Sequence, residues 1–121
     1  MCRLAFSVQY NLFFLGEIMT NPHHNEDMKA FFEAILRLES IEECASFFED
    51  ICTIRELQDI SQRLKVASML DEGKNYKEIC DQTGASTATI SRVNRCLIYG
   101  SGGYRTALDK TPKKEQNNEG K

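Results

Sequence analysis

The sequence contains no apolar run that approaches the ~18 to 20 residues needed to cross a bilayer, which argues against a membrane protein. Its five cysteines are odd in number, irregularly spaced and without a Cys-x-x-Cys pair, so neither a zinc site nor a disulfide framework is predicted. Its two histidines, His23 and His24, lie together in a polar stretch and are interpreted as solvent-exposed loop residues. We therefore expect a cytoplasmic protein with reduced thiols and no metal.

Arrangements of residues that are typical of catalysis are also missing. No Ser/His/Asp or Cys/His combination is suggested, and no pair of carboxylates stands apart from the ordinary acids of helix surfaces. The glycine-rich stretch Gly100-Ser101-Gly102-Gly103 follows no predicted strand and precedes no Gly-Lys-Ser/Thr, so it is interpreted as a flexible break rather than a phosphate-binding loop. The sequence therefore predicts that the protein is not an enzyme.

Acidic side chains are absent from one part of the chain, although the formal net charge is −3. Residues 1–81 contain 15 acidic and 8 basic side chains, whereas residues 82–108 contain Arg92, Arg95 and Arg105 and no acid. Fields are screened beyond ~8 to 10 Å at cellular salt, so the local charge of a surface decides whether it attracts a polyanion. Residues 82–108 are therefore where a nucleic-acid contact is expected.

The length of 121 residues allows a single domain, which we divide into three segments. Residues 1–25 are interpreted as an N-terminal extension that is either disordered or a start artefact, the natural protein then beginning near Met19 or Met28. Residues 26–110 are predicted to form an all-α, helical domain. Residues 111–121 are polar and rich in lysine and are expected to be a disordered tail.

Apolar residues recur at three- and four-residue intervals after a turn-rich linker at 21–25, and no later stretch alternates as a strand does. The pattern predicts three helices, at residues 28–38, 41–51 and 54–71. Capping-box spacing occurs at the start of the second and third, as Ser40 with Glu43 and Thr53 with Glu56. Gly73 and Asn75 are expected to end the third helix.

Two phenylalanine pairs, Phe31-Phe32 and Phe47-Phe48, give these helices more than one apolar face. A domain of this size buries about one face of each helix by itself, and large exposed apolar patches are unusual on monomers. The surplus of apolar surface on these helices indicates a partner chain. A compact monomer that buries the same residues in its own core is the alternative.

Residues Tyr76–Leu97 have the spacing of a helix-turn-helix. Two short helices that meet at a sharp angle need a small residue where they cross, which Cys80 supplies. They need a residue that tolerates positive φ four positions later, which is Gly84. They also need an apolar anchor six positions further on, which is Ile90, and Ser86 is a suitable N-cap for the second helix.

At 100° per residue, Ile90, Val93 and Leu97 share one side of the second helix and are expected to face the core. The opposite side, called here the outward face, is small, hydroxylated and basic, and comprises Thr87, Ala88, Ser91, Arg92 and Arg95. Such a surface fits a major groove ~12 Å wide, where Arg contacts guanine and methyl groups contact thymine. The predicted interface with double-stranded DNA consists of the outward face, Ser86 and Lys77. Lys77 and the N-terminus of its helix are placed for phosphate contacts.

The string Gly84–Arg92 resembles the DNA-contacting segment of the Trp repressor superfamily. Residues 55–73 and 97–104 resemble its YerC/YecD-like branch, and the similarity covers roughly residues 28–110. The resemblance implies an intertwined all-α homodimer, in which two helix-turn-helix units contact half-sites about one DNA turn apart. It also provides a partner for the surplus aromatic surface.

The resemblance further implies an effector site formed by two arginines. Arg92 matches the first, and the second falls at Gln62 or Arg63, depending on where a one-residue gap is placed. In the family, a glycine after the first arginine lets the indole ring of tryptophan lie against the backbone, and here that position is Val93. Because a valine side chain crowds the ring, we predict that tryptophan is not a corepressor and expect no cofactor.

Two other functions are compatible with the same residues. The second helix could dock onto another protein, which would make the chain a helical protein–protein interaction module. It could also bind DNA for replication rather than for transcription, because similar helix-turn-helix units occur in replication initiators. Steep salt dependence distinguishes DNA binding from protein docking. The sequence favours a transcriptional regulator that contacts the major groove.

Overall fold

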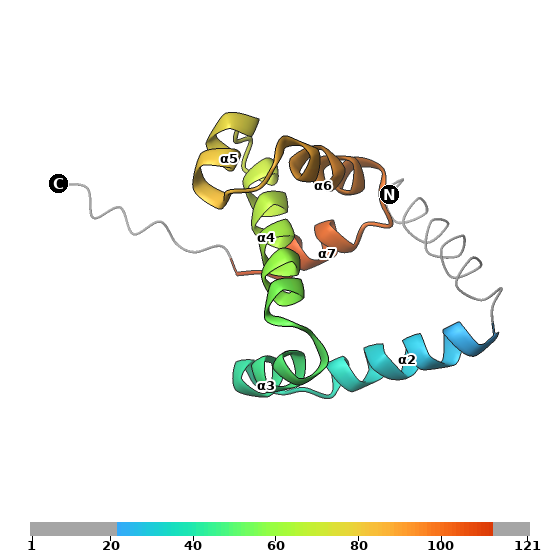
Figure 1. The fold of residues 1–121 in the computed structure, drawn as a ribbon. Helices are drawn as coiled ribbons and strands as arrows, with labels where there is room; N and C mark the ends of the chain where they lie inside the picture. Colours follow the sequence, from blue (N-terminus) through green and yellow to red (C-terminus); the bar gives the residue numbers. More distant parts are fainter. Residues whose placement is uncertain (1–21, 113–121) are drawn as a thin grey trace. The chain divides into compact units, whose positions relative to one another are not determined.

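The computed structural model describes residues 22–112, and these form six α-helices and no strand. The helices are α2 (Pro22–Leu36), α3 (Ile41–Ile51), α4 (Ile54–Asp71), α5 (Tyr76–Thr83), α6 (Thr87–Tyr99) and α7 (Gly103–Lys110) (Figure 1). The all-α fold predicted from the sequence is confirmed. Residues 1–21 of the extension predicted at 1–25, and residues 113–121 of the tail predicted at 111–121, lie outside the described residues.

The chain divides into two compact units, residues 1–65 and 66–121, with the boundary inside α4. They are called unit 1 and unit 2, and each is described by itself. No helix within residues 22–112 is long and apolar enough to cross a membrane. The four cysteines of this range, Cys44, Cys52, Cys80 and Cys96, are free thiols.

Helix α2 begins earlier than the sequence analysis predicted. The stretch from Pro22 to Asn25 was expected to be a turn-rich linker, but it forms the first turn of α2. Proline has a φ angle suited to a helix and lacks only an N–H that the first turn leaves unpaired. Pro22 therefore starts the helix instead of preventing it.

Of the two capping boxes predicted in unit 1, the one at Thr53 is complete, whereas at Ser40 the returning bond goes to the residue before the cap. The Ser40 hydroxyl accepts a hydrogen bond from the Glu43 N–H at 3.1 Å, and the Glu43 carboxylate accepts one from the Glu39 N–H at 2.8 Å. At α4, the Thr53 hydroxyl accepts from the Glu56 N–H at 3.2 Å, and the Glu56 carboxylate accepts from the Thr53 N–H at 2.8 Å. These bonds pair N–H groups that a helix start otherwise leaves without partners.

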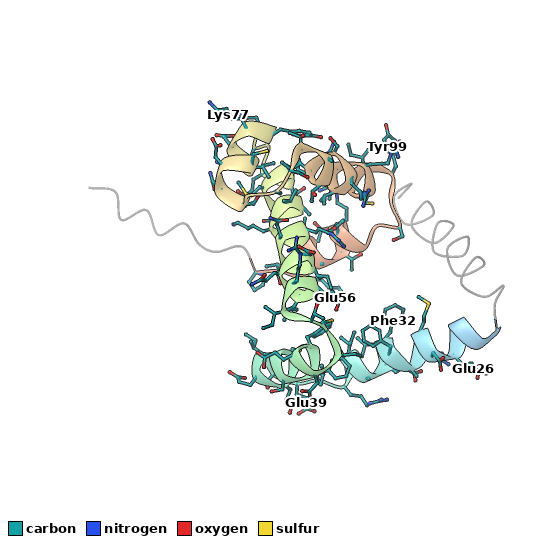
Figure 2. The ribbon with its side chains drawn as sticks, viewed as in Figure 1. Glu26, Phe32, Glu39, Glu56, Lys77 and Tyr99 are labelled. Carbon is teal, nitrogen blue, oxygen red and sulfur yellow. The ribbon has the colours of Figure 1, made fainter. Side chains whose placement is uncertain are left out.

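Unit 1 contains no buried side chain among its described residues, 26–65. The phenylalanines of α2 and α3 pack together, with the Phe31 and Phe47 ring centroids 6.1 Å apart, yet Phe32 remains half exposed (Figure 2). Large apolar side chains are exposed on all three helical segments: Phe32, Leu36, Ile41, Ile51, Ile54, Ile60 and Leu64. The surplus apolar surface expected from the sequence is therefore exposed within this chain.

Unit 2 has a closed core to which α4, α5, α6 and the turn before α6 contribute. Its fully buried residues are Val66, Ala67, Met69, Ile79, Ala85, Ile90 and Val93, and Leu97 is nearly so. Tyr104 and Leu108 of α7 pack against this cluster, and α6 and α7 lie side by side (Figure 1). An ion pair between Arg105 and Asp71 further joins α7 to the end of α4.

Candidate nucleic-acid interface

Helix α5 begins with a complete capping box. The Asn75 side chain accepts a hydrogen bond from the Glu78 N–H at 2.9 Å, and the Glu78 carboxylate accepts one from the Asn75 N–H at 3.0 Å. The sequence analysis assigned Asn75 to the end of the preceding helix. The helix before it ends at Asp71, as its predicted bounds of 54–71 had it, and Gly73 follows with φ +81°, so Asn75 belongs to the start of α5. The Asn-x-x-Glu spacing was the signal that could have identified this cap.

The turn between α5 and α6 is built around Gly84. Its φ of +69° is the left-handed conformation that L side chains rarely adopt, and its N–H donates to the Cys80 carbonyl at 2.9 Å. The predicted positive-φ position is therefore confirmed. Cys80, the predicted small residue, is half-buried and packs against the core.

Thr83 contributes to the same turn and was missed by the sequence analysis. Its hydroxyl donates to the Ile79 carbonyl at 2.6 Å and accepts from the Ala85 N–H at 3.1 Å. The Thr83 side chain thus joins the last turn of α5 to Ala85, which is buried in the core beyond Gly84. Threonine hydroxyls commonly bond to backbone groups nearby, which is the only signal that the sequence contains.

Helix α6 starts at the predicted N-cap. The Ser86 hydroxyl accepts from the Thr89 N–H at 3.1 Å and lies 3.0 Å from the Thr89 hydroxyl. Ser86 therefore has a structural role that is visible in the chain itself, beside the DNA contact predicted for it. This cap sets where the outward face begins.

The two sides of α6 differ in burial as predicted. Ile90, Val93 and Leu97 are at most 7% exposed, and Ile90 is fully buried as the expected anchor. The outward face is exposed at every position: Thr87, Ala88, Ser91, Arg92 and Arg95. Its side chains are therefore available to a ligand within this chain, and their contact with DNA stays a prediction.

The charges of unit 2 leave the outward face cationic. Within residues 22–112, the ion pairs join Lys29 to Glu33 and Arg105 to Asp71, and neither involves Arg92 or Arg95. Arg105, the third cation of the acid-free stretch, is thus compensated by Asp71 on another helix. The cationic character of unit 2 that remains on α6 comes from Arg92 and Arg95 alone.

Lys77 is exposed on α5, as its predicted phosphate contact requires, and projects outward (Figure 2). The N-terminus of α5 itself is less suited to phosphate than expected. The Glu78 carboxylate accepts a hydrogen bond there, which satisfies an N–H group and places a negative charge at the helix start. On α5, the Lys77 side chain therefore suits a phosphate contact, whereas the helix N-terminus does not.

The residues of the predicted effector site are distributed over the two units. Arg63 lies on α4 in unit 1 and is exposed, and Arg92 lies on α6 in unit 2 and is exposed. Gln62, the alternative to Arg63, is half-buried. Val93 is 2% exposed and belongs to the core of unit 2.

Comparison with known proteins agrees with this geometry. Residues 26–112 match the family model of the Trp repressor protein. YerC, an uncharacterised protein of Bacillus subtilis (strain 168), is 52% identical over 90 residues, which are 74% of this chain and 86% of that protein. A solved structure from Staphylococcus aureus and that of a TrpR-like protein from Eubacterium eligens ATCC 27750 both match with a TM-score of 0.68 and 50% identity. Each covers 69% of this chain, and the match spans 84% and 87% of their own chains.

Proposed function

Because the chain belongs to the Trp repressor family, which consists of helix-turn-helix DNA-binding regulators, we propose that it is a sequence-specific transcriptional regulator that binds double-stranded DNA through α6. The observation that carries the proposal is the two-sided character of α6. Its buried side anchors it in the core of unit 2, while its outward face is exposed, cationic and without an acid. The family consists of regulators rather than enzymes, and no catalysis is assigned.

The chemistry of the outward face suits the major groove. Small side chains at Ala88 and Ser91 allow close approach of the helix to base edges, and Arg92 or Arg95 can bond to guanine O6 and N7. Lys77 on α5 supplies a phosphate contact beside the groove, which positions the protein without specifying sequence.

The protein acts as a homodimer in this proposal, and unit 1 supports that assignment. Its helices bury no described side chain within the chain, while Leu36 and Ile41 are each 84% exposed. A second copy is the partner that supplies an identical apolar surface in equal amount, and a twofold dimer makes such a patch complementary to itself. Two copies of α6 would then contact half-sites about one DNA turn apart.

Tryptophan is not proposed as the corepressor. Val93 stands where the family resemblance expects a glycine, and its side chain packs in the core of unit 2. Room for an indole beside Arg92 would require this side chain to move. Isothermal titration calorimetry of the purified protein with tryptophan is expected to give no saturable heat, and tight binding would contradict the proposal.

Arg92→Ala tests the DNA-binding proposal. Affinity of the purified protein for duplex DNA, measured by fluorescence anisotropy, should fall steeply as salt rises, because bound cations are released from the phosphates. If Arg92 contacts a base, its removal should cost about 1 to 3 kcal/mol and reduce discrimination between sequences. Selection of bound sequences from a random duplex pool supplies the specific site for this measurement.

Arg55→Ala is the matched control, because Arg55 is an exposed arginine of α4 in unit 1 and its loss changes the net charge equally. It is expected to leave DNA affinity within about twofold, as for a cation that is not among the predicted contacts and neutralises no phosphate. Equal loss in both variants would assign the effect to net charge. Absence of duplex binding at low salt would contradict the proposed function. Footprinting on the genome would show whether the bound sites are promoters or replication origins, and so distinguish transcription from replication.

A further inference from the structure

The carboxyl end of α6 has two exposed side chains that the predicted DNA interface does not include. Ile98 is 58% exposed and Tyr99 is 74% exposed, although both follow directly on the buried Leu97. The predicted interface ends at Arg95, but α6 continues for one more turn and ends at Tyr99. Both side chains are therefore accessible to a ligand, and Tyr99 carries a phenol hydroxyl that can form a hydrogen bond.

The position of Tyr99 around the helix places it on the outward face. At 100° per residue it lies about 20° from Arg92 and about 40° from Arg95, on the arc between them. It lies about 160° from Leu97, which is buried. Ile98 lies about 60° from Arg95, toward the flank of the same face. Tyr99 therefore continues the outward face by one turn.

The length of α6 then decides what Tyr99 can contact. Tyr99 lies eleven residues beyond Ala88, which is about 16 Å along the helix axis. The major groove is only ~12 Å wide, so a helix that enters it by its amino-terminal turns has its last turn at the edge, where the sugar-phosphate backbone runs. The phenol hydroxyl is a donor, and tyrosine hydroxyls are among the groups that bond to phosphate oxygens.

Figure 2 shows a second residue with the same orientation. Lys77 on α5 and Tyr99 at the end of α6 both project from the side of unit 2 that faces away from α7. Lys77 is already the predicted phosphate contact on the α5 side of the outward face. Tyr99 lies at its opposite end.

We propose that Tyr99 is a DNA-binding residue whose hydroxyl donates a hydrogen bond to a backbone phosphate at the edge of the groove that α6 occupies. This inference rests on the proposed function and adds a contact to it. Together with Lys77, it positions α6 from both ends and carries no sequence information of its own. A second copy of the chain covering Ile98 and Tyr99 is the competing explanation, and the test below distinguishes the two.

Tyr99→Phe removes only the hydroxyl, and Tyr99→Ala removes the ring as well. Because a hydrogen bond to a charged group contributes about 1.5 kcal/mol or more, Tyr99→Phe should weaken duplex binding roughly tenfold, and Tyr99→Ala at least as much. The loss should be equal on the selected site and on an unrelated duplex. The slope of affinity against salt should not change, because a neutral hydroxyl releases no cation.

Ile98→Ala is the matched control for loss of exposed apolar surface at the same helix end, and it should change affinity by less than about twofold, as for a surface substitution without a contact. Sedimentation velocity of all three variants should show the same oligomeric state as the unsubstituted protein. These results together would support the phosphate contact.

Several results would overturn it. If the unsubstituted protein binds DNA and Tyr99→Phe binds equally well, the Tyr99 contact is wrong and the proposed function stands. If Tyr99→Ala or Ile98→Ala dissociates a dimer, the helix end belongs to the subunit interface, and the contact is again wrong. If the unsubstituted protein binds no duplex at low salt, the proposed function fails, and the inference fails with it.

Discussion

The two units of this chain differ in how much of their apolar surface is buried. Unit 2 closes a core with eight buried side chains, although its helices α5 and α7 are only eight residues long. The described part of unit 1 contains four phenylalanines, against none in that of unit 2, but buries none of its residues. Burial of apolar area is the main stabilising contribution to folding, so the core of unit 2 stabilises its fold, whereas the described residues of unit 1 leave apolar surface for the second copy that we propose.

The units also differ in charge. Residues 26–65 contain 10 acidic and 5 basic side chains, whereas residues 66–112 contain 5 acidic and 6 basic ones. The acids of unit 2 lie outside α6. An acidic, apolar unit repels a polyanion and offers surface to another protein, and a unit with a cationic exposed face attracts DNA. This difference in charge supports the proposal that unit 1 serves assembly and unit 2 binds DNA.

The largest expected effect comes from opening the core of unit 2. Ile90→Ala should lower the free energy of unfolding by about 2 to 5 kcal/mol, because Ile90 is fully buried and the lost methyl groups leave a cavity. Urea unfolding monitored by circular dichroism measures this. Ile98→Ala, on the same helix but exposed, should cost less than about 0.5 kcal/mol. Equal costs at both positions would contradict the division into a buried and an exposed side.

The next effect concerns unit 1, where a similar truncation should act on assembly. Leu36→Ala removes an exposed side chain, so in a single chain it would cost almost nothing. In a dimer that buries it, the loss should weaken association by about 1 to 3 kcal/mol, as for a residue at the centre of an interface. Sedimentation equilibrium gives this value, and the thermal midpoint should depend on protein concentration. A monomer at every concentration would contradict the dimer.

The smallest effect concerns the turn that presents α6. Thr83→Val keeps the shape of the side chain but leaves the Ala85 N–H without its hydroxyl acceptor, at a cost of about 1 kcal/mol. Thr83→Ser keeps the hydroxyl and should retain DNA affinity, whereas Thr83→Val should lose part of it if the turn angle sets the position of α6. Urea unfolding and anisotropy measure the two effects separately. Wild-type behaviour of Thr83→Val would show that Gly84 alone defines the turn.

Features that depend on neighbouring residues were predictable. The caps at Ser40, Thr53 and Ser86 and the positive φ at Gly84 follow from bonds that span three or four residues. The errors have the same origin. Pro22 was interpreted as a linker residue and Asn75 as a helix end, because proline and asparagine serve equally well at helix starts and in turns.

The sequence predicted which face of α6 belongs to the candidate interface, as far as Arg95. It did not predict that the last turn of α6 continues that face. Helical periodicity separates Ile90 from Arg92 without knowledge of any neighbour. Whether Tyr99 is covered depends on what packs at the end of α6, which periodicity does not contain. The exposure of Tyr99 therefore emerged only from the folded chain.

The sequence by itself determined the helix starts at Ser40, Thr53 and Ser86 and the turn at Gly84, because caps and glycine act within one or two turns. Tertiary structure decided which apolar faces are closed and which cations are compensated. The pairing of Arg105 with Asp71 joins residues 34 positions apart, and the exposed apolar side chains of unit 1 contrast with an equally apolar but buried set in unit 2. These contacts depend on which surfaces pack together in the folded chain. The residues next to each position in the sequence do not determine that packing.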